Sequence, residues 1–195
     1  MKKDIVLTGV GGQGAISIAV AIVEAANKKG LNFRQSEVHG MSQRGGAVET
    51  HVRISDGAIH CEMIPRGRAD ILISVEPLEA LRGINYLSEK GIVITAITPV
   101  KNIPDYPPIE HVFNMLAASG RKVYTVDAQA AALEAGNPKA QNIALTGAAS
   151  AFIGIAPELL RESVARMFMK KGEAVVASNL KAFDLGKTRA VKLES

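Results

Sequence analysis

Short apolar runs alternate with amphipathic segments along this chain of 195 residues. Mainly apolar runs, typical of strands buried on both faces of a sheet, occur at residues 5–7, 69–75 and 92–97, and shorter strands are predicted at 31–36 and 123–126. Helices are predicted at 15–26, 77–89, 109–119, 140–154, from 157 and at 172–183, with Asp127 as a further N-cap. We therefore expect one domain, residues 1–195, with an α/β fold: a Rossmann-like, mostly parallel sheet, helices on both faces and a helical carboxyl-terminal part.

Residues 47–64 depart from this alternation of strands and helices. Apolar and polar residues alternate with period two from Ala47 to Ile54, and a second extended run follows Ser55-Asp56-Gly57. Asp-Gly is a strong signal for a tight hairpin turn. We expect an inserted β-hairpin whose arms are residues 47–54 and 58–64.

A glycine-rich turn joins the first strand to the first helix, and its candidate ligand- or interface-binding residues are Gly9, Gly11, Gly12, Gln13 and Gly14. The glycines match the G-x-G-x-x-G dinucleotide fingerprint, and they let a ligand approach the backbone at a helix N-terminus. The acid expected about 20 residues further on is missing, although the nearby Arg34 suits a 2′-phosphate. A dinucleotide, another anionic ligand or partner surface, and glycine packing alone all remain open.

A second glycine-rich segment, residues 37–46, is polar and without period, so we expect a loop. Its candidate ligand- or interface-binding residues are His39, Gly40, Gln43, Arg44, Gly45 and Gly46. The planar guanidinium of Arg44 suits a phosphate or carboxylate, and the glycines beside it allow close approach. The alternative for Arg44 is a surface salt bridge.

Composition limits the classes of function. The net charge is +4 and the basic residues are spread along the chain, which does not favour nucleic acid as a partner. A single cysteine, Cys61, cannot form an internal disulfide or supply the thiolates of an iron–sulfur cluster. No apolar run reaches the roughly 18–20 residues of a membrane span, so we expect no membrane partner and a cytoplasmic location.

No catalytic or metal-binding residue is predicted from spacing. His51 and His60 fall on opposite arms of the expected hairpin, which is typical of a solvated pair rather than a zinc site with Cys61. Asp56-Gly57, with Asn85 further on, has some likeness to the motif that holds magnesium on thiamine diphosphate, but the period-two flanks favour a hairpin turn. A nucleophile with a base and an orienting acid is not evident.

Two motifs together resemble a known family. Gly9-Val-Gly-Gly-Gln-Gly14, followed by Ser36-Glu-Val-His-Gly-Met-Ser-Gln-Arg-Gly-Gly-Ala-Val48, is similar to the gamma-type domain of the 2-oxoacid:ferredoxin oxidoreductases, most of all to the beta (small) subunit of indolepyruvate ferredoxin oxidoreductase. Weaker likeness continues through Glu76-Pro-Leu-Glu-Ala-Leu-Arg82, Asn142 and Asn179. The resemblance covers nearly the whole chain.

The resemblance implies a subunit that is inactive alone. Such enzymes oxidatively decarboxylate a 2-oxoacid, here indolepyruvate or another arylpyruvate, to acyl-CoA and CO2 and reduce ferredoxin. Thiamine diphosphate, magnesium and iron–sulfur (4Fe-4S) clusters would then lie on a larger partner subunit, coenzyme A would be a co-substrate, and this chain alone would bind no cofactor. The two glycine-rich segments would line a site between subunits. The alternatives are a stand-alone dinucleotide-binding oxidoreductase or sensor and an architectural protein.

Overall fold

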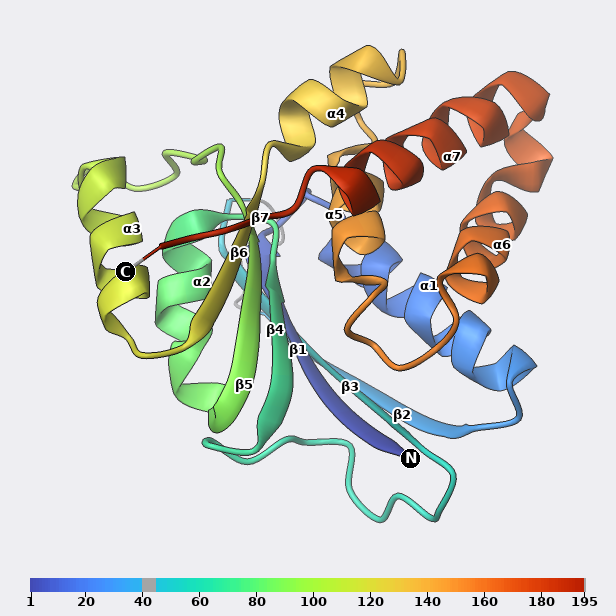
Figure 1. Cartoon of the computed structure of the whole chain (residues 1–195), viewed down its shortest axis with the longest axis horizontal. Helices are drawn as coiled ribbons and strands as arrows, with labels where there is room; N and C mark the ends of the chain where they lie inside the picture. Colours follow the sequence, from blue (N-terminus) through green and yellow to red (C-terminus); the bar gives the residue numbers. More distant parts are fainter. Residues whose placement is uncertain (40–44, 195) are drawn as a thin grey trace.

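The computed structural model describes residues 1–39 and 45–194, which form a seven-stranded sheet in the order β2-β3-β1-β4-β5-β6-β7 (Figure 1). The strands are β1 (Lys2–Val10), β2 (Asn32–His39), β3 (Ala47–Ser55), β4 (Ala69–Ser74), β5 (Leu87–Ala96), β6 (Lys122–Val126) and β7 (Val191–Lys192). The helices are α1 (Ala15–Lys28), α2 (Pro77–Gly83), α3 (Ile109–Ala118), α4 (Ala128–Glu134), α5 (Gln141–Ala149), α6 (Pro157–Phe168) and α7 (Glu173–Thr188), with short 3-10 turns η1 (Ile84–Tyr86) and η2 (Met169–Lys171).

Five of the strands run in one direction. β1, β4, β5 and β6 pair in parallel, β3 is antiparallel to both β1 and β2, and β7 is antiparallel to β6. β2 therefore points the same way as β1, with β3 inserted between them. The expected mostly parallel sheet is confirmed.

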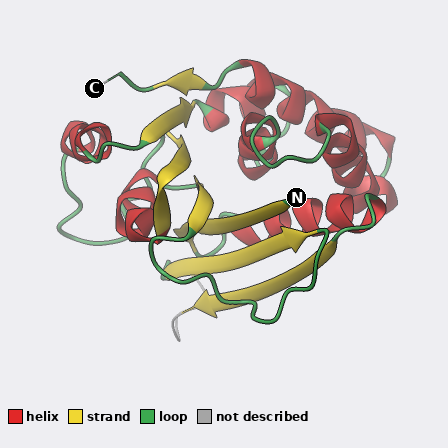
Figure 2. Ribbon diagram, turned by 60° about the horizontal axis from the view of Figure 1, so that its bottom comes forward, coloured by secondary structure: helices red, strands yellow, loops and turns green. Residues whose placement is uncertain are grey.

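Helices cover both faces of the sheet, with α2 and α3 on one side and α1, α5, α6 and α7 on the other (Figures 1 and 2). Ile5 and Leu7 pack into the larger core under α1 and α5, whereas Val6 points into the smaller core under α2 and α3. All three side chains are fully buried. The apolar run at 5–7 is thus a strand buried on both faces, as its pattern predicts.

The hairpin predicted at 47–64 is wrong in its pairing. A hairpin exists, but its arms are β2 and β3, while residues 56–68 form no strand. β3 already has β2 on one edge and β1 on the other, so the second extended run finds no free edge beside it. The period-two pattern correctly predicted a strand beginning at Ala47, but such a pattern does not identify which strands pair with it.

The boundary between the helix predicted at 77–89 and the next strand is also wrong. The helical segment ends at Tyr86, and β5 begins at Leu87, where it pairs with Ala69. Gly91, expected as a helix stop, lies inside β5, where an added Cβ would come within 2.9 Å of the Ala69 carbonyl oxygen. The close approach of two strands, and not a helix end, requires glycine there.

Two carboxyl-terminal helices touch backbone to backbone. A Cβ at Gly147 of α5 would lie 2.0 Å from the carbonyl oxygen of Phe183, and one at Gly186 of α7 would lie 1.8 Å from that of Ala144. Side chains are excluded at this crossing. α7 therefore holds α5 firmly in place, and α5 in turn packs next to the first helix.

The described helices include none with the length and apolarity that a membrane crossing requires. β7 at the sheet edge has no counterpart among the predicted strands, because its two residues are too few to carry a pattern.

Candidate functional site

A crevice lies at the carboxyl ends of the parallel strands, where the chain passes from β1 to β2 on one side and then to β4 on the other. Ligands of open α/β sheets bind at such switch points. A cavity of about 540 Å³ opens here. It is lined by Gly12, Gln13, Val75, Ala96, Val100, Ala128, Pro138, Lys139, Gln141 and Leu145. We call it the glycine-turn cavity.

The glycines of the first motif are needed for different reasons. Gly12 and Gly14 have φ angles of +100° and +81°, which side-chain-bearing residues rarely adopt. A Cβ at Gly12 would meet nothing within 4 Å, so its backbone is open to a ligand. A Cβ at Gly14 would lie 2.6 Å from Asn142 Nδ2, and one at Gly9 would lie 2.2 Å from Val75 Cγ2. Gly12 thus leaves the backbone open to a ligand, whereas Gly9 and Gly14 are needed for packing.

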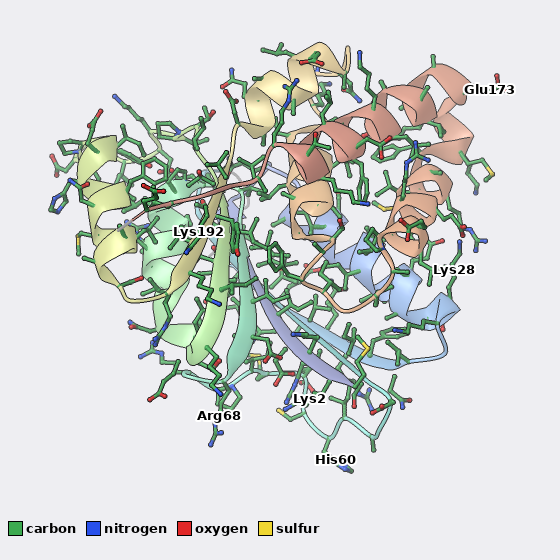
Figure 3. All side chains as sticks on the ribbon, in the orientation of Figure 1. Lys2, Lys28, His60, Arg68, Glu173 and Lys192 are labelled. Atoms are coloured by element: carbon green, nitrogen blue, oxygen red, sulfur yellow. The ribbon has the colours of Figure 1, made fainter. Side chains whose placement is uncertain are left out.

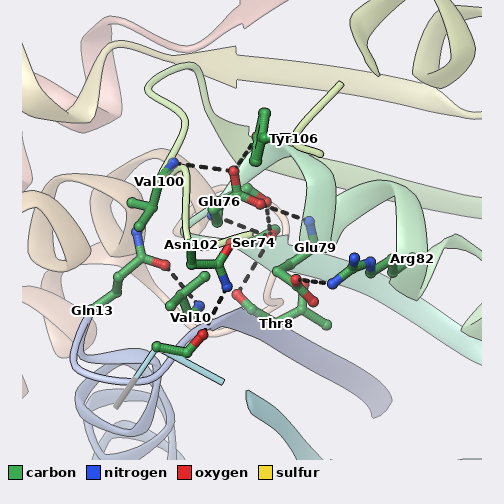
Figure 4. Close-up of polar contacts among 11 residues, drawn as sticks. Thr8, Val10, Gln13, Ser74, Glu76, Glu79, Arg82, Val100, Asn102 and Tyr106 are labelled. Atoms are coloured by element: carbon green, nitrogen blue, oxygen red, sulfur yellow. Dashed lines mark hydrogen bonds and ion pairs between the residues drawn. The ribbon is translucent and has the colours of Figure 1, made fainter. Parts of the chain in front are cut away.

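Gln13 closes the turn with its own side chain. Its Oε1 accepts a hydrogen bond from the Val10 amide at 2.8 Å (Figure 4), and its Nε2 donates to the Val75 carbonyl at 3.1 Å. The amide thereby ties the end of β1 to the end of β4. Gln13 lines the cavity, but both of its polar ends are already engaged.

The two glycine-rich segments meet, as expected. The Gly11 amide donates to the Gly46 carbonyl at 2.8 Å, and the Gly45 amide donates to the Gly11 carbonyl at 3.4 Å. Asn102 Nδ2 donates to the Gly45 carbonyl at 2.8 Å. His39, which we predicted in a loop, is the last residue of β2.

Three predicted residues of the second segment, Gly40, Gln43 and Arg44, lie outside the described residues. Their assignment to a ligand or an interface stays a prediction.

A buried carboxylate that sequence analysis left without a role stands beside the cavity. Glu76 is 1% exposed and caps α2, its Oε2 accepting from the Glu79 amide at 2.9 Å. Its Oε1 accepts from the Val100 amide at 3.3 Å and from the Tyr106 hydroxyl (Figure 4). Burial, together with the hydrogen bond to Glu76, raises the pKa of Tyr106. The available signal was Glu76-Pro77, an N-cap followed by proline at the first helical position.

A second cavity of about 600 Å³ adjoins the glycine turn on the side of α7. Lys139 and Lys171 line it together with Gly12, Gly14 and Ser17 at the start of α1. Two ammonium groups and the amino end of a helix favour an anion. This surface is suited to binding and orienting a polar, negatively charged group.

Sequence analysis missed both lysines. Lys139 follows the break at Gly136-Asn-Pro138, and Lys171 lies in η2, far along the chain from the glycine motif. The break signalled a loop, but no local pattern places either residue beside residue 12.

The sheet order argues against a dinucleotide on this turn. In that arrangement the second strand borders the first and offers its end to the ribose. Here β3 separates the two, and Arg34 lies opposite Arg53, which lies opposite Asp4, toward the amino end of β1. Arg34 is therefore far from the turn. Glu37 lines a third cavity of about 440 Å³ with Gly11, but from the displaced strand.

His51 and His60 lie in different surroundings, one buried and one pointing outward (Figure 3). His51 is fully buried, unlike the solvated residue that we expected; its Nδ1 accepts from the Ile64 amide at 2.9 Å, so Nε2 donates to Glu49 Oε1 at 2.7 Å. That hydrogen bond lowers the pKa of Glu49. His60 points outward from the irregular segment (Figure 3). Among residues 1–39 and 45–194, no three His, Cys, Asp or Glu side chains gather as metal ligands would.

Sequence comparison identifies relatives of matching length. The profile of the pyruvate ferredoxin/flavodoxin oxidoreductase family matches residues 4–188. A Pyrococcus horikoshii protein named indolepyruvate oxidoreductase subunit IorB is 39% identical over 95% of this chain and 95% of its own length. The Methanothermobacter thermautotrophicus protein of the same name is 38% identical over 94% of this chain and 95% of its own length.

Structure comparison supports the fold. The pyruvate oxidoreductase subunit PORC of Thermotoga maritima matches with a TM-score of 0.77 and 22% identity, over 99% of both chains. A 2-oxoglutarate:ferredoxin oxidoreductase from Magnetococcus marinus, with 2-oxoglutarate, coenzyme A and succinyl-CoA bound, matches with a TM-score of 0.75 and 24% identity. That match covers 96% of this chain but 30% of the other. The expected α/β fold is confirmed.

Proposed function

The protein belongs to the pyruvate ferredoxin/flavodoxin oxidoreductase family, and on that premise we propose that it is the small subunit of an enzyme that oxidises indolepyruvate or a related arylpyruvate. The observation that carries the proposal is the end-to-end correspondence with subunits named IorB, at 35–39% identity. The resemblance found from the two glycine-rich motifs is confirmed at the level of the family.

The proposed reaction breaks the bond between the carboxylate and the 2-oxo carbon and releases CO2. The acyl carbon loses two electrons to ferredoxin, and the thiol of coenzyme A, which gives up its proton, takes the acyl group as a thioester. Thiamine diphosphate with magnesium would stabilise the carbanion of the decarboxylation, and iron–sulfur clusters would carry the electrons. This chain would contribute binding and positioning.

The described residues do not form a site for thiamine diphosphate or for an iron–sulfur cluster, which supports placing both cofactors on a larger partner. The single cysteine, Cys61, is exposed, whereas a cluster takes four thiolates. Asp56, the acid of the possible thiamine motif, pairs with the amino-terminal ammonium group. In the Magnetococcus marinus enzyme the counterpart of this protein makes up 30% of a longer chain, consistent with a domain that works beside others.

For this chain we propose a role in holding the anionic part of coenzyme A. Gly12 offers an open backbone, and Lys139 and Lys171 line the same cavity as Gly12. The phosphates of coenzyme A match that chemistry. Gly11, Gly45 and Gly46 would form the adjoining wall, toward the partner subunit.

Co-purification with the larger partner tests the proposal. The complex is expected to reduce a viologen dye with indolepyruvate and coenzyme A, while the isolated chain is expected to give no turnover. Lys171→Ala should raise the KM for coenzyme A about two- to tenfold by removing a charged contact. The matched control is Lys170→Ala, from the same turn but outside the cavity lining. Turnover by the isolated chain, or a complex inactive with every arylpyruvate, would contradict the proposal.

The alternative of a stand-alone dinucleotide-binding protein is tested on the same isolated chain. A rise in its melting temperature with NADPH, but not with coenzyme A, would favour that alternative. Ferredoxin as the physiological acceptor and a cytoplasmic location stay predictions.

A further inference from the structure

The two residues that follow β4, Val75 and Glu76, form hydrogen bonds with two different segments beside the glycine-turn cavity. Gln13 Nε2 donates to the Val75 carbonyl, which ties the glycine turn to β4. The next residue, Glu76, accepts from the Val100 amide and the Tyr106 hydroxyl, both in the connection 97–108 between β5 and α3. Val100 itself lines the cavity together with Gly12 and Gln13 of the glycine turn.

The same connection reaches the second glycine-rich segment. Asn102 lies between the two residues that Glu76 holds, and its Nδ2 donates to the Gly45 carbonyl at 2.8 Å (Figure 4). Gly45 and Gly46 in turn form backbone hydrogen bonds with Gly11. A continuous path of hydrogen bonds thus runs from Glu76 through Asn102 to the turn.

Glu76 is itself held rigidly. Ser74, fully buried, donates its hydroxyl to the Glu76 carbonyl at 2.6 Å, and the carboxylate is fixed by the α2 cap. Three donors converge on the two carboxylate oxygens: the amides of Glu79 and Val100 and the Tyr106 hydroxyl. Oε2 is held within α2, so Oε1 is free to clamp Val100 and Tyr106 of the connection 97–108.

We propose that Glu76 and Asn102 are positioning residues for the glycine turn: Glu76 fixes the connection 97–108, and Asn102 transmits that position to the Gly45–Gly46 backbone against Gly11. The inference rests on the proposed function for its kinetic consequence. Its structural part concerns this chain alone. Neither side chain takes part in bond breaking.

The first test measures amide hydrogen exchange at Gly11 by NMR on the isolated chain. Asn102→Ala removes only the donor to Gly45, and exchange at Gly11 is expected to rise about two- to tenfold. Tyr106→Phe and Glu76→Gln should act in the same direction. The matched control is Asn32→Ala, which loses a similar bond to the Gly57 carbonyl, 3.2 Å long, at the opposite end of the sheet; it should leave Gly11 unchanged.

The second test uses the complex with the larger subunit. Asn102→Ala should raise the KM for coenzyme A about two- to tenfold while kcat stays within about twofold, a split that general loss of folded protein does not produce. Unchanged exchange at Gly11 in Asn102→Ala would overturn the structural inference even if the enzyme is active. If exchange changes but the wild-type complex oxidises no arylpyruvate, the proposed function fails and the positioning path stands.

Discussion

Replacing Gly14 by alanine is expected to lower the free energy of unfolding by about 1–4 kcal/mol, the sum of two separate effects. Gly14 caps α1 with a φ of +81°. The left-handed conformation costs an L residue about 1–2 kcal/mol, of which about 0.4–1 is offset by reduced freedom of the unfolded chain.

The second effect is steric. An alanine Cβ at position 14 would lie 2.6 Å from Asn142 Nδ2. Asn142 is 8% exposed and donates to the Gly14 carbonyl at 3.1 Å, so it has little room to withdraw. Overpacking of a buried contact costs about 1–3 kcal/mol.

Two further variants separate these effects. Gly12→Ala has the same conformational problem at φ +100° but no atom within 4 Å, so about 1 kcal/mol is expected. Adding Asn142→Ala to Gly14→Ala removes the clash, so the double variant should lose about 1–3 kcal/mol less than the sum of the single losses. Urea unfolding followed by circular dichroism gives each value, provided that the m-values agree.

Equal losses in Gly12→Ala and Gly14→Ala would refute the steric part of the reasoning. Strict additivity of Gly14→Ala and Asn142→Ala would do the same. Wild-type stability in both single variants would show that the turn does not need its left-handed conformations.

Two other substitutions probe the crossing of α5 and α7 and the buried acid Glu79. Gly186→Ala forces α7 away from the Ala144 carbonyl; a loss of about 3 kcal/mol, or a fall in Tm of about 6–12 °C, is expected, and an unchanged melting curve would contradict the crossing. Burial raises the pKa of Glu79 above its ordinary value of 4.5, although Arg82 opposes the shift. Its contribution to stability is full below pH 4.5 and is lost as pH rises through the raised pKa. Glu79→Gln should flatten that decline in urea titrations at several pH values; an identical pH profile would count against it.

Features set by a few neighbouring residues were predictable. Asp127 caps α4 as expected, its Oδ1 accepting from the Ala130 amide at 2.8 Å. The glycine turn lies between a buried strand and a helix, and the two glycine-rich segments meet. In each case the chemistry of adjacent residues, a capping oxygen or a missing Cβ, decides the conformation.

Features that depend on which segments become neighbours were not predictable. The period-two pattern of β3 fits any partner strand, so it did not show that β2 and β1 both flank it. That arrangement removes Arg34 from the turn. Glu76 gives no sign in sequence that Val100 and Tyr106 will donate to it, because those contacts span a strand and a long connection.

The sequence by itself determined the strand–turn–helix at residues 2–28, the α/β class and, through two glycine-rich motifs, the family. Short-range sterics and hydrogen bonding are enough for such features. Only the tertiary structure decided what surrounds the turn: Asn142 behind Gly14, the clamp of Glu76 and Asn102, and the positive charges of Lys139 and Lys171. These residues are distant along the chain, and packing of the whole sheet and its helices brings them together.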